Sequence, residues 1–578
     1  MTQAINSPLL VHVPEEPPKV LSSDEALKAC GDSHWYQIRV TIILALQSTV
    51  IAFILQGQPF LFLPPKFQCH RDNGETYLCD ETEGCKEANP MVDPNASNSL
   101  VVHFGLYCDR EYLKGLTQTI FFVISNISTL IFSFLADYKG RKITILILYC
   151  IGSLPLIVAA FAQNWTMFMV FLIMAGIGVN PFSALCFVLL SESAGEKLRQ
   201  LSSIALLVTW VIGELLFVPI AYYYPDWQIL LLYWIAIPLT VQIVTYVWVY
   251  ESPKFLIMKK RFAEAKTVLL KIAKVNKIKV EEFTFKEEVN FESYENASIE
   301  DLDNPNVESK KKVKKSKKIY TYYDLFRYPS QLKITLILCV AYFGIYLTYY
   351  GGIFALDDLG SNIYITAILT DCAELVSYVV SNPVVRCLRR KVSFPICFFA
   401  VAACCMLFLA TDDPMVYMFL AMITKFFVSI AFSIVFIYTA ELYPTTVRSL
   451  GIGLTTFVGK FGCALAPILI SEFKYSLNIH PMVAFGIFSI IAGVTVCFLK
   501  ETFKVDLEDE IPEEAIKNKV DREDKLEAAK ERKEYLDRSN KELTTKEKLS
   551  SGDEPEENSS PVKGISSPKT RKETNFSD

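Results

Sequence analysis

The segment that decides the fold is residues 438–467, which read YTAELYPTTVRSLGIGLTTFVGKFGCALAP. It joins the end of one apolar stretch to the beginning of the next, and Glu441 and Arg448 lie in the short polar connection between them. Lys460 follows in the middle of the second apolar stretch. An ammonium group at the centre of a bilayer costs roughly 2.5–3.5 kcal/mol, so such a residue usually faces a polar cavity or a partner. Lys460 is therefore a candidate functional residue.

The composition indicates an all-α, polytopic membrane protein. Of the 578 residues, 52% are hydrophobic, and long apolar runs recur along the chain. A membrane-spanning helix needs roughly 20 mainly apolar residues at a rise of about 1.5 Å each. We therefore predict twelve transmembrane helices, near residues 40–63, 115–136, 143–162, 166–190, 201–224, 228–249, 333–356, 363–385, 392–411, 415–438, 449–471 and 481–499.

Basic residues are concentrated in alternate connections between the predicted spans. These connections include 137–142, the Lys-rich region 254–327 and 386–391. Because Lys and Arg are retained on the cytoplasmic side, we expect these connections and both chain termini to be cytoplasmic. The first 38 residues are polar and resemble neither a signal peptide nor an Arg-rich transit peptide. The first span must then act as the membrane signal. We expect a multi-pass protein, with the plasma membrane as its location.

The longest connection on the opposite side of the membrane is the loop 64–114. Four cysteines cluster in this loop: Cys69, Cys79, Cys85 and Cys108. In an extracytoplasmic loop such a cluster predicts two disulfides, and three connectivities are open. Asn95 begins an Asn-Ala-Ser sequon in the same loop, so we expect it to carry a glycan. No Cys or His spacing in the sequence indicates a metal site.

The two halves of the chain repeat each other. Glu192 and Arg199 follow the fourth predicted span, and Glu441 and Arg448 follow the tenth, an offset of 249 residues (441 − 192 = 249). Parallel six-helix repeats with a central linker resemble the plan of the major facilitator superfamily, in which substrate binds near the midplane between the halves. We therefore expect a cytoplasmic segment 1–38, a six-helix bundle 39–249, a cytoplasmic linker 250–332, a second bundle 333–503, and a charged, partly disordered cytoplasmic tail 504–578.

An ordered series of motifs carries a family resemblance. The motifs are Gly31-Asp-Ser-His-Trp-Tyr-Gln37, Cys108-Asp-Arg-Glu-Tyr-Leu-Lys114, Asp137-Tyr-Lys-Gly-Arg-Lys142, Glu251-Ser-Pro-Lys-Phe-Leu256, Leu359-Gly-Ser-Asn-Ile-Tyr364 and Glu441-Leu-Tyr-Pro-Thr-Thr-Val-Arg448. Over about residues 30–504 the chain resembles the organic ion transporter family, which includes cation, anion and carnitine carriers. It departs at Phe132 and Ser133, where the family commonly has Gly, which puts a close approach of the second span to the eleventh in doubt. The loop 386–391 also lacks the usual Asp and Gly.

Six charged residues at the cytoplasmic ends of the spans are candidate gating residues: Asp137, Arg141, Glu192, Arg199, Glu441 and Arg448. We expect these charges to pair across the cytoplasmic seam in one state of the transporter and to separate in the other. The alternative is that they are static clamps and topology signals.

Buried charges and tyrosines are candidate substrate-binding residues. The resemblance implies that Glu374 occupies the position of an acid in cation and carnitine carriers, and that Lys460 occupies the position of a base in anion and carnitine carriers. One carboxylate and one ammonium suit a zwitterion of carnitine or betaine type. The alternative is that Glu374 and Lys460 pair only with each other, or that Glu374 binds protein groups. Glu214 is a third buried charge, either a coupling or cation site or a partner of Lys460.

Tyrosines in the seventh span form a second group of candidates. Tyr342, Tyr346 and Tyr349 are spaced for one helix face, where their rings would attract a quaternary ammonium, although aromatic stripes are more often packing. Lys425 either reaches toward the interface or faces the cavity.

The expected partners are a small organic ion, the lipid bilayer and a coupling cation, either sodium or a proton. We expect neither a cofactor nor nucleic acid, and no enzymatic activity, because Gly459-Lys460 lacks the spacing of a phosphate-binding loop. An organic anion carrier, a sugar-porter-like carrier and a non-transporting scaffold or receptor on the same fold are the alternatives.

Overall fold

The computed structural model describes residues 19–70, 75–86, 91–289, 320–360, 362–477, 479–503 and 511–512. The described residues from 19 to 503 form one compact unit. The disordered tail expected over 504–578 lies almost entirely outside the described residues, and so do residues 290–319 of the linker.

Eleven helices in the described part of the chain are long and apolar enough to cross a membrane, and a twelfth apolar helix is shorter. The eleven are α2 (Trp35–Leu61), α5 (Tyr112–Lys139), α6 (Arg141–Ala160), α7 (Trp165–Ser193), α8 (Glu196–Tyr223), α9 (Trp227–Trp248), α14 (Pro329–Phe354), α15 (Ile363–Cys387), α16 (Arg390–Leu407), α17 (Pro414–Leu442) and α18 (Arg448–Ser471). The shorter one is α19 (Met482–Val496). The all-α fold with two sets of six helices is confirmed.

Local sequence signals explain where several helices begin and end. The side chains of Asn164, Asn362 and Asp413 accept hydrogen bonds from backbone N–H groups in the first turns of α7, α15 and α17. Pro414 stands at the first position of α17, where its missing N–H costs nothing. Gly140 separates α5 from α6 with a φ of 116°, a conformation that residues with a side chain rarely adopt.

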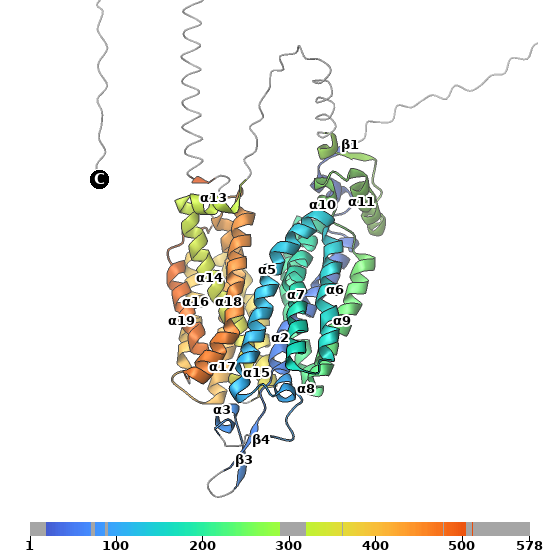
Figure 1. Cartoon of the computed structure of the whole chain (residues 1–578). Helices are drawn as coiled ribbons and strands as arrows, with labels where there is room; N and C mark the ends of the chain where they lie inside the picture. The colour runs from blue at the N-terminus through green and yellow to red at the C-terminus, as the bar shows by residue number, and fades with distance from the viewer. Residues whose placement is uncertain are drawn as a thin grey trace, which may run out of the picture. The chain divides into compact units, whose positions relative to one another are not determined.

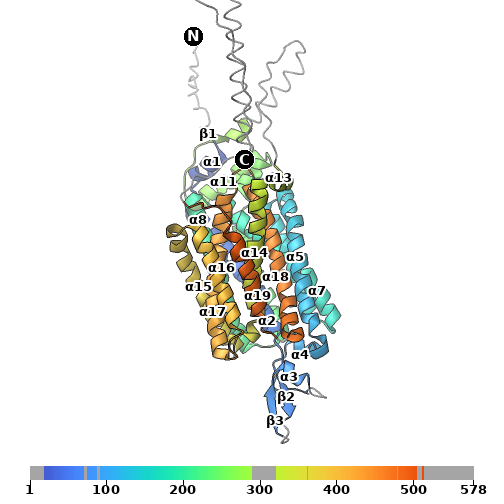
Figure 2. The same ribbon diagram turned by 90° about the vertical axis from the view of Figure 1, so that its left-hand side faces the viewer.

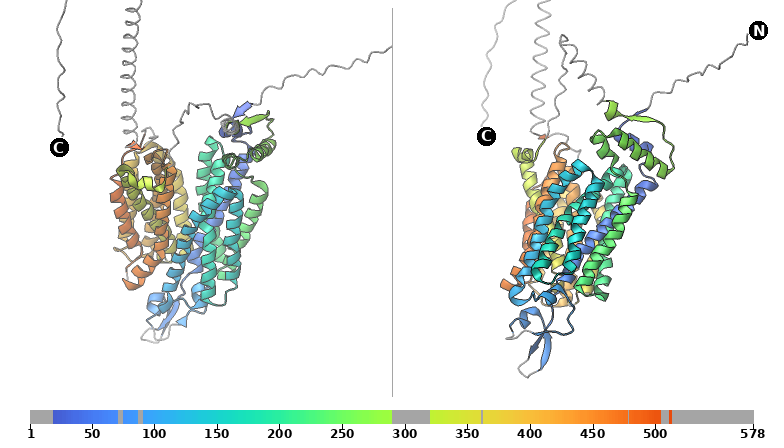
Figure 3. Two further views of the ribbon diagram at one scale, coloured as in Figure 1. Left: turned by 45° about the horizontal axis from the view of Figure 1, so that its top comes forward. Right: turned by 45° about the vertical axis from the view of Figure 1, so that its right-hand side comes forward.

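The helices form two bundles, α2 with α5–α9 and α14–α19 (Figure 1). Figure 2 turns the second bundle toward the viewer, and Figure 3 shows both bundles from two further directions. Within the first bundle, small residues allow close helix packing: a Cβ atom on Gly178 would lie 2.6 Å from the Leu148 carbonyl oxygen, and one on Gly213 would lie 2.8 Å from the Thr49 Cα.

The outward faces of the helices are apolar and the inward faces carry the polar residues. Val379 is 71% exposed on the outside of α15, whereas Glu374 on the same helix is fully buried. Phe134 on α5 is 74% exposed. Since lipid tails solvate such side chains, this distribution fits a multi-pass membrane protein.

The bundles meet chiefly toward one end of the molecule, which we call the loop end because it carries the loop between α2 and α5. Thr119 Oγ1 donates to the Ala464 carbonyl oxygen at 2.8 Å, and Asn126 Nδ2 donates to the Phe457 carbonyl oxygen at 3.0 Å. These bonds join α5 to α18. The second and eleventh spans therefore approach each other closely despite Phe132 and Ser133.

The opposite end, called the linker end, carries a small folded region. It contains β1 (Lys19–Leu21), α1 (Ser23–Ala29), α10 (Pro253–Met258), α11 (Phe262–Asn276) and β5 (Phe283–Phe285). At the same end, α13 (Tyr322–Arg327) packs against α14 and α18 of the second bundle. β1 pairs in parallel with β5, and Asn276 accepts from the Tyr36 N–H at 2.8 Å while donating to the Cys30 carbonyl oxygen at 2.9 Å. Parts of the polar segments 1–38 and 250–332 thus fold together at the first bundle.

The loop between α2 and α5 has its own small sheet. Its elements are β2 (Phe67–His70), β3 (Thr76–Cys79), α3 (Glu81–Gly84), β4 (Met91–Val92), α4 (Leu100–Phe104) and η1 (Cys108–Arg110), with the antiparallel strand order β3-β2-β4. Short turns η2 (Leu356–Asp358) and η3 (Glu472–Ser476) lie in the second bundle.

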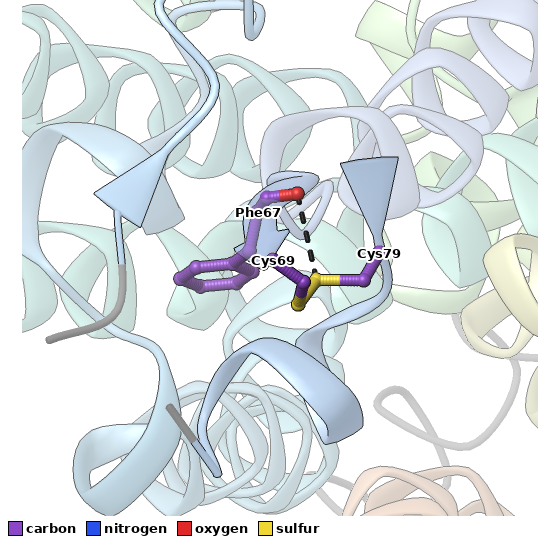
Figure 4. Close-up of a disulfide and its surroundings, with 3 residues drawn as sticks. All are labelled: Phe67, Cys69 and Cys79. Carbon is purple, nitrogen blue, oxygen red and sulfur yellow. Dashed lines mark hydrogen bonds between the residues drawn. A yellow bond between two sulfur atoms is a disulfide. The ribbon is translucent and has the colours of Figure 1, made fainter. Parts of the chain in front are cut away.

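The two expected disulfides are present in this loop. Cys69 pairs with Cys79, and Cys85 pairs with Cys108. Figure 4 shows the first bridge, with Cys79 Sγ 3.5 Å from the Phe67 carbonyl oxygen. Cys69, Cys79 and Glu83 are also the one grouping of potential metal ligands found among the described residues, but both sulfurs belong to the disulfide. Asn95 is exposed, and its glycosylation stays a prediction.

We predict that digestion of the native protein without reduction yields two cross-linked peptide pairs, one joining Cys69 to Cys79 and one joining Cys85 to Cys108. Replacing Cys85 and Cys108 together by Ser should shorten the half-life in detergent, because a disulfide closing such a loop contributes about 2–4 kcal/mol. Cys150→Ser, at an exposed free thiol, is the control. Free thiols at all four loop positions, or a different pairing, would contradict the structure.

Candidate functional site

A cluster of buried charges lies where the two bundles meet. It consists of Glu214 on α8, Asp371 and Glu374 on α15, and Lys425 on α17. The exposed fractions of these residues are 0%, 1%, 0% and 7%. Lys425 Nζ lies 2.8 Å from Glu374 Oε2 and 3.8 Å from Glu214 Oε2. One ammonium therefore stands among three carboxyl groups.

Glu374 has the most complete set of donors in this cluster. Its Oε1 accepts hydrogen bonds from the Tyr349 hydroxyl at 2.8 Å and from the Tyr378 hydroxyl at 2.7 Å, while Oε2 faces Lys425. Glu374 and Lys425 thus form an internally satisfied ion pair.

Glu214 is bound less completely than Glu374. Its Oε1 accepts from Trp210 Nε1 at 2.9 Å, and the same indole N–H lies 3.1 Å from the Tyr349 hydroxyl oxygen. Trp210 and Glu214 both lie on α8 of the first bundle and Tyr349 lies on α14 of the second, so the contact between Trp210 and Tyr349 crosses the interface between the bundles. The polar cluster is therefore assembled from both halves of the repeat.

The tyrosines of α14 are largely covered by protein. The Lys425 ammonium lies 4.0 Å from the centroid of the Tyr349 ring, a cation–π contact supplied by the protein itself. The Tyr342 and Tyr346 rings stack with centroids 6.5 Å apart, and both residues are buried. In this conformation packing therefore covers the predicted aromatic face, and its contact with substrate stays a prediction.

A small cavity adjoins the charge cluster. Its volume is about 20 Å³, which is room for roughly one water molecule. The polar residues that line it are Gln56, Thr348, Tyr349, Thr370, Asp371, Thr424 and Lys425. The cavity is too small for an organic ion, so a substrate would need the bundles to move apart.

Lys460 is not part of this cluster. It is half-buried on α18, and among the described residues it has neither an ion pair nor a side-chain hydrogen bond. The structure thus pairs Glu374 and Glu214 with Lys425, not with Lys460. Sequence reasoning noted Lys425 without assigning it a role, and it missed Asp371. The available signal was a second acid one helical turn before Glu374 in an apolar segment.

The gating candidates form two similar clusters at the linker end, one within each bundle. Arg141 lies 3.2 Å from Glu192 and 3.1 Å from Asp137, and Arg390 lies 3.1 Å from Glu441. The two Arg–Glu pairs have the same sequence separation of 51 residues.

Acids at the ends of the sixth and twelfth helices complete the two clusters. Glu251 accepts from the Arg141 backbone N–H at 3.0 Å, and Glu501 accepts from the Arg390 backbone N–H at 3.2 Å. The internal repeat seen in the sequence is therefore also a repeat of ion-pair geometry.

In this conformation the described charges pair within the bundles, and their pairing across the cytoplasmic seam stays a prediction. Glu441 binds Arg390 and not Arg448, whose Nε donates to the Tyr443 carbonyl oxygen at 3.3 Å. Asp137 stays within its own bundle and is 66% exposed at the side chain. The side chain of Arg199 lies outside the described residues. The ion pairs described at this end thus lie within bundles, because the bundles meet at the loop end.

A third charged group lies at the loop end of the second bundle. Lys474 Nζ lies 2.6 Å from Asp358 Oδ1, and His480 packs against the rings of Phe408 and Tyr417. Burial raises the pKa of Asp358, but the Lys474 ammonium more than offsets this and holds the pKa below its usual value. Burial lowers the pKa of His480. At neutral pH Asp358 is therefore ionised and His480 is neutral.

The fold and sequence have known relatives. The chain resembles the xylose transporter XylE of E. coli in an inward open conformation, with a TM-score of 0.56 and 13% identity over 81% of this chain and 97% of that one. It is 26% identical to solute carrier family 22 member 3 of Rattus norvegicus, over 83% of this chain and 93% of the relative.

Two further relatives have similar identities. Human organic cation/carnitine transporter 2 is 26% identical over 75% of this chain and 74% of its own length. Solute carrier family 22 member 7 of Rattus norvegicus is 29% identical over 72% of this chain and 74% of its own length. The family model of the sugar (and other) transporters matches residues 75–513, which is more than half of the chain. The chain therefore belongs to the sugar (and other) transporter family and has the fold of the major facilitator superfamily, and the relatives named above are similar to it over most of its length.

Proposed function

We propose that this transporter carries small organic cations or zwitterions of carnitine or betaine type by alternating access. The observation that carries the proposal is the buried cluster of three carboxyl groups around the single ammonium of Lys425. An excess of acids in a site with low water content favours a positively charged ligand. The likeness to human organic cation/carnitine transporter 2 supports the same substrate class.

A zwitterion needs a second, cationic contact for its carboxylate. Lys460 supplies one, because its ammonium has no ion pair among the described residues and sits about midway along α18. Glu374 would face the ammonium end of the substrate once the bundles separate. Tyr342, Tyr346 and Tyr349 would then offer ring faces to the same end. An organic anion carrier would instead depend on Lys460 and tolerate loss of Glu374.

Alternating access follows from where the bundles touch. They are joined by α5–α18 and α8–α15 contacts toward the loop end, whereas the Arg141 and Arg390 clusters each lie within one bundle at the linker end. If the bundles rock about the substrate site, the α5–α18 and α8–α15 contacts would open and the two bundles would approach each other at the linker end. The charged clusters would keep each bundle rigid during this motion.

We predict that Lys460→Asp weakens uptake of zwitterions and anions by tenfold or more relative to simple cations, because the ammonium contact becomes a repulsion. Glu374→Gln should reduce cation and zwitterion uptake more than anion uptake. The measurement is uptake of labelled cations, zwitterions and anions into proteoliposomes at equal reconstituted protein. Lys271→Gln, an exposed position on α11, is the matched control. An unchanged ranking of substrates in folded Lys460→Asp protein would exclude this site.

We also predict that Glu192→Gln and Glu441→Gln lower turnover by on the order of fivefold or more while changing the apparent substrate affinity little. Each change removes one partner of an arginine, buried Arg141 or half-buried Arg390, but leaves the substrate site untouched. Asp137→Asn should have the same effect in smaller degree, because its side chain is exposed. Initial uptake rates over a range of substrate concentrations separate the two parameters.

Glu264→Gln is the control for the gating variants, because its pair with Arg261 lies on the exposed surface of α11. A loss of affinity equal to the loss of turnover would show that the clusters act on the substrate site and not on the conformational equilibrium.

A further inference from the structure

The charges of the buried cluster do not balance without a proton. Lys425 lies closest to Glu374 at 2.8 Å, and that ion pair is complete with its two tyrosine donors. Glu214 and Asp371 remain, both at least 99% buried, with no second ammonium beside them in the described residues. Two further ionised carboxylates in such a place are costly, and a buried acid without a counter-charge takes up a proton instead.

Glu214 and Asp371 are also placed to share that proton. Glu214 Oε2 is buried, has no hydrogen-bond partner among the described residues and lies 3.8 Å from Lys425 Nζ, and Asp371 lines the small cavity beside the same ammonium. An ionised carboxylate can only accept a hydrogen bond, so a bond between two carboxyl groups requires that one of them be protonated. Glu214 is on α8 in the first bundle and Asp371 is on α15 in the second. The shared proton would therefore bridge the two moving halves.

Gln56 and the small cavity next to Asp371 provide a place for a water molecule that exchanges the proton. Gln56 on α2 donates from Nε2 to Asp371 Oδ2 at 3.3 Å, while its Oε1 is buried and has no hydrogen-bond partner. Gln56 is 1% exposed, and it lines the cavity of about 20 Å³ together with Asp371 and Lys425. That space fits a water molecule but no organic ion. A water there would receive or deliver the proton.

The groups around Glu214 and Asp371 favour a proton over a sodium ion as the coupling ion. The groups that face the two acids are Gln56 of α2, Trp210 of α8, Tyr349 and Tyr350 of α14, Glu374 of α15 and Lys425 of α17. A sodium ion in the cavity would lie against the Lys425 ammonium, which lines the same space. A proton on a carboxyl group meets no such repulsion, because it removes a negative charge without adding a cation.

We propose that Glu214 and Asp371 form a proton-sharing pair that couples substrate transport to proton movement. This rests on the proposed transport of organic cations or zwitterions. With α8 and α15 together, one carboxyl group is protonated and donates to the other. When the helices separate, the O–H bond breaks, the proton passes to water, and two carboxylates remain to attract the ammonium of the substrate. One proton leaves for each cation that binds, so transport is an exchange of the two.

The test uses the full chain in proteoliposomes with labelled tetraethylammonium as probe and a pH-sensitive dye in the lumen. We expect vesicles that are one pH unit more acidic inside to accumulate the probe about tenfold, since exchange of one proton for one cation equates the two gradients. External probe should make the lumen more alkaline. Replacing sodium by potassium on both sides should leave uptake unchanged.

Asp371→Asn and Glu214→Gln should each lower the number of protons moved per molecule of probe transported at least tenfold, whatever their effect on the rate of probe uptake. Glu264→Gln, an exposed acid, should behave as the wild type. If a variant does not fold, the wild-type measurement still shows whether proton movement accompanies transport of the probe, and its absence refutes the proposal.

Two outcomes distinguish the proposals. If the wild type exchanges probe but moves no protons, or follows the sodium gradient, the proton-sharing pair is refuted and the transport function stands. If it shows no exchange of probe, anion or zwitterion under any gradient, the transport function itself is refuted.

Discussion

The ion pair between Lys425 and Glu374 is the interaction on which the candidate site depends. Neither charge can be held at membrane depth alone, and each is fully or almost fully buried. Their 2.8 Å contact joins α17 to α15, and the Tyr349 hydroxyl extends the network to α14. Breaking one partner would leave an uncompensated buried charge, which typically costs about 3–5 kcal/mol. The polar network thus fixes how three helices of the second bundle pack.

The contacts of Glu214 and Asp371 that cross the bundle interface are longer than the pair between Lys425 and Glu374. Lys425 is 3.8 Å from Glu214, and Gln56 is 3.3 Å from Asp371. Such contacts can be exchanged for water or for a charged ligand at small cost, whereas the pair within the second bundle cannot. This difference in strength separates a rigid half from a movable interface. It also explains why an organic ion would compete for the interface acids before it disturbs Glu374.

The linker end shows the same division between rigid and movable parts. Arg141 with Glu192, and Arg390 with Glu441, fasten helices inside one bundle each, at nearly equal distances of 3.2 and 3.1 Å. Backbone N–H groups at the starts of α6 and α16 add Glu251 and Glu501 to these clusters, where a helix N-terminus favours a carboxylate. The repeat of the two halves therefore preserves a charge arrangement and not only a helix count.

The membrane class, the two six-helix halves, the cysteine loop and the positions of the intramembrane charges can all be predicted from the sequence alone. These follow from apolar length, from the 249-residue offset and from the cost of charge in lipid, all of which act along the chain. Only the tertiary structure decided which charges meet. Lys425 and Lys460 give the same signal in one dimension, but helix packing brings the first within 2.8 Å of Glu374 and leaves the second without an ion pair among the described residues. Side-chain pairing depends on the rotation of each helix against its neighbours, and no local pattern records that rotation.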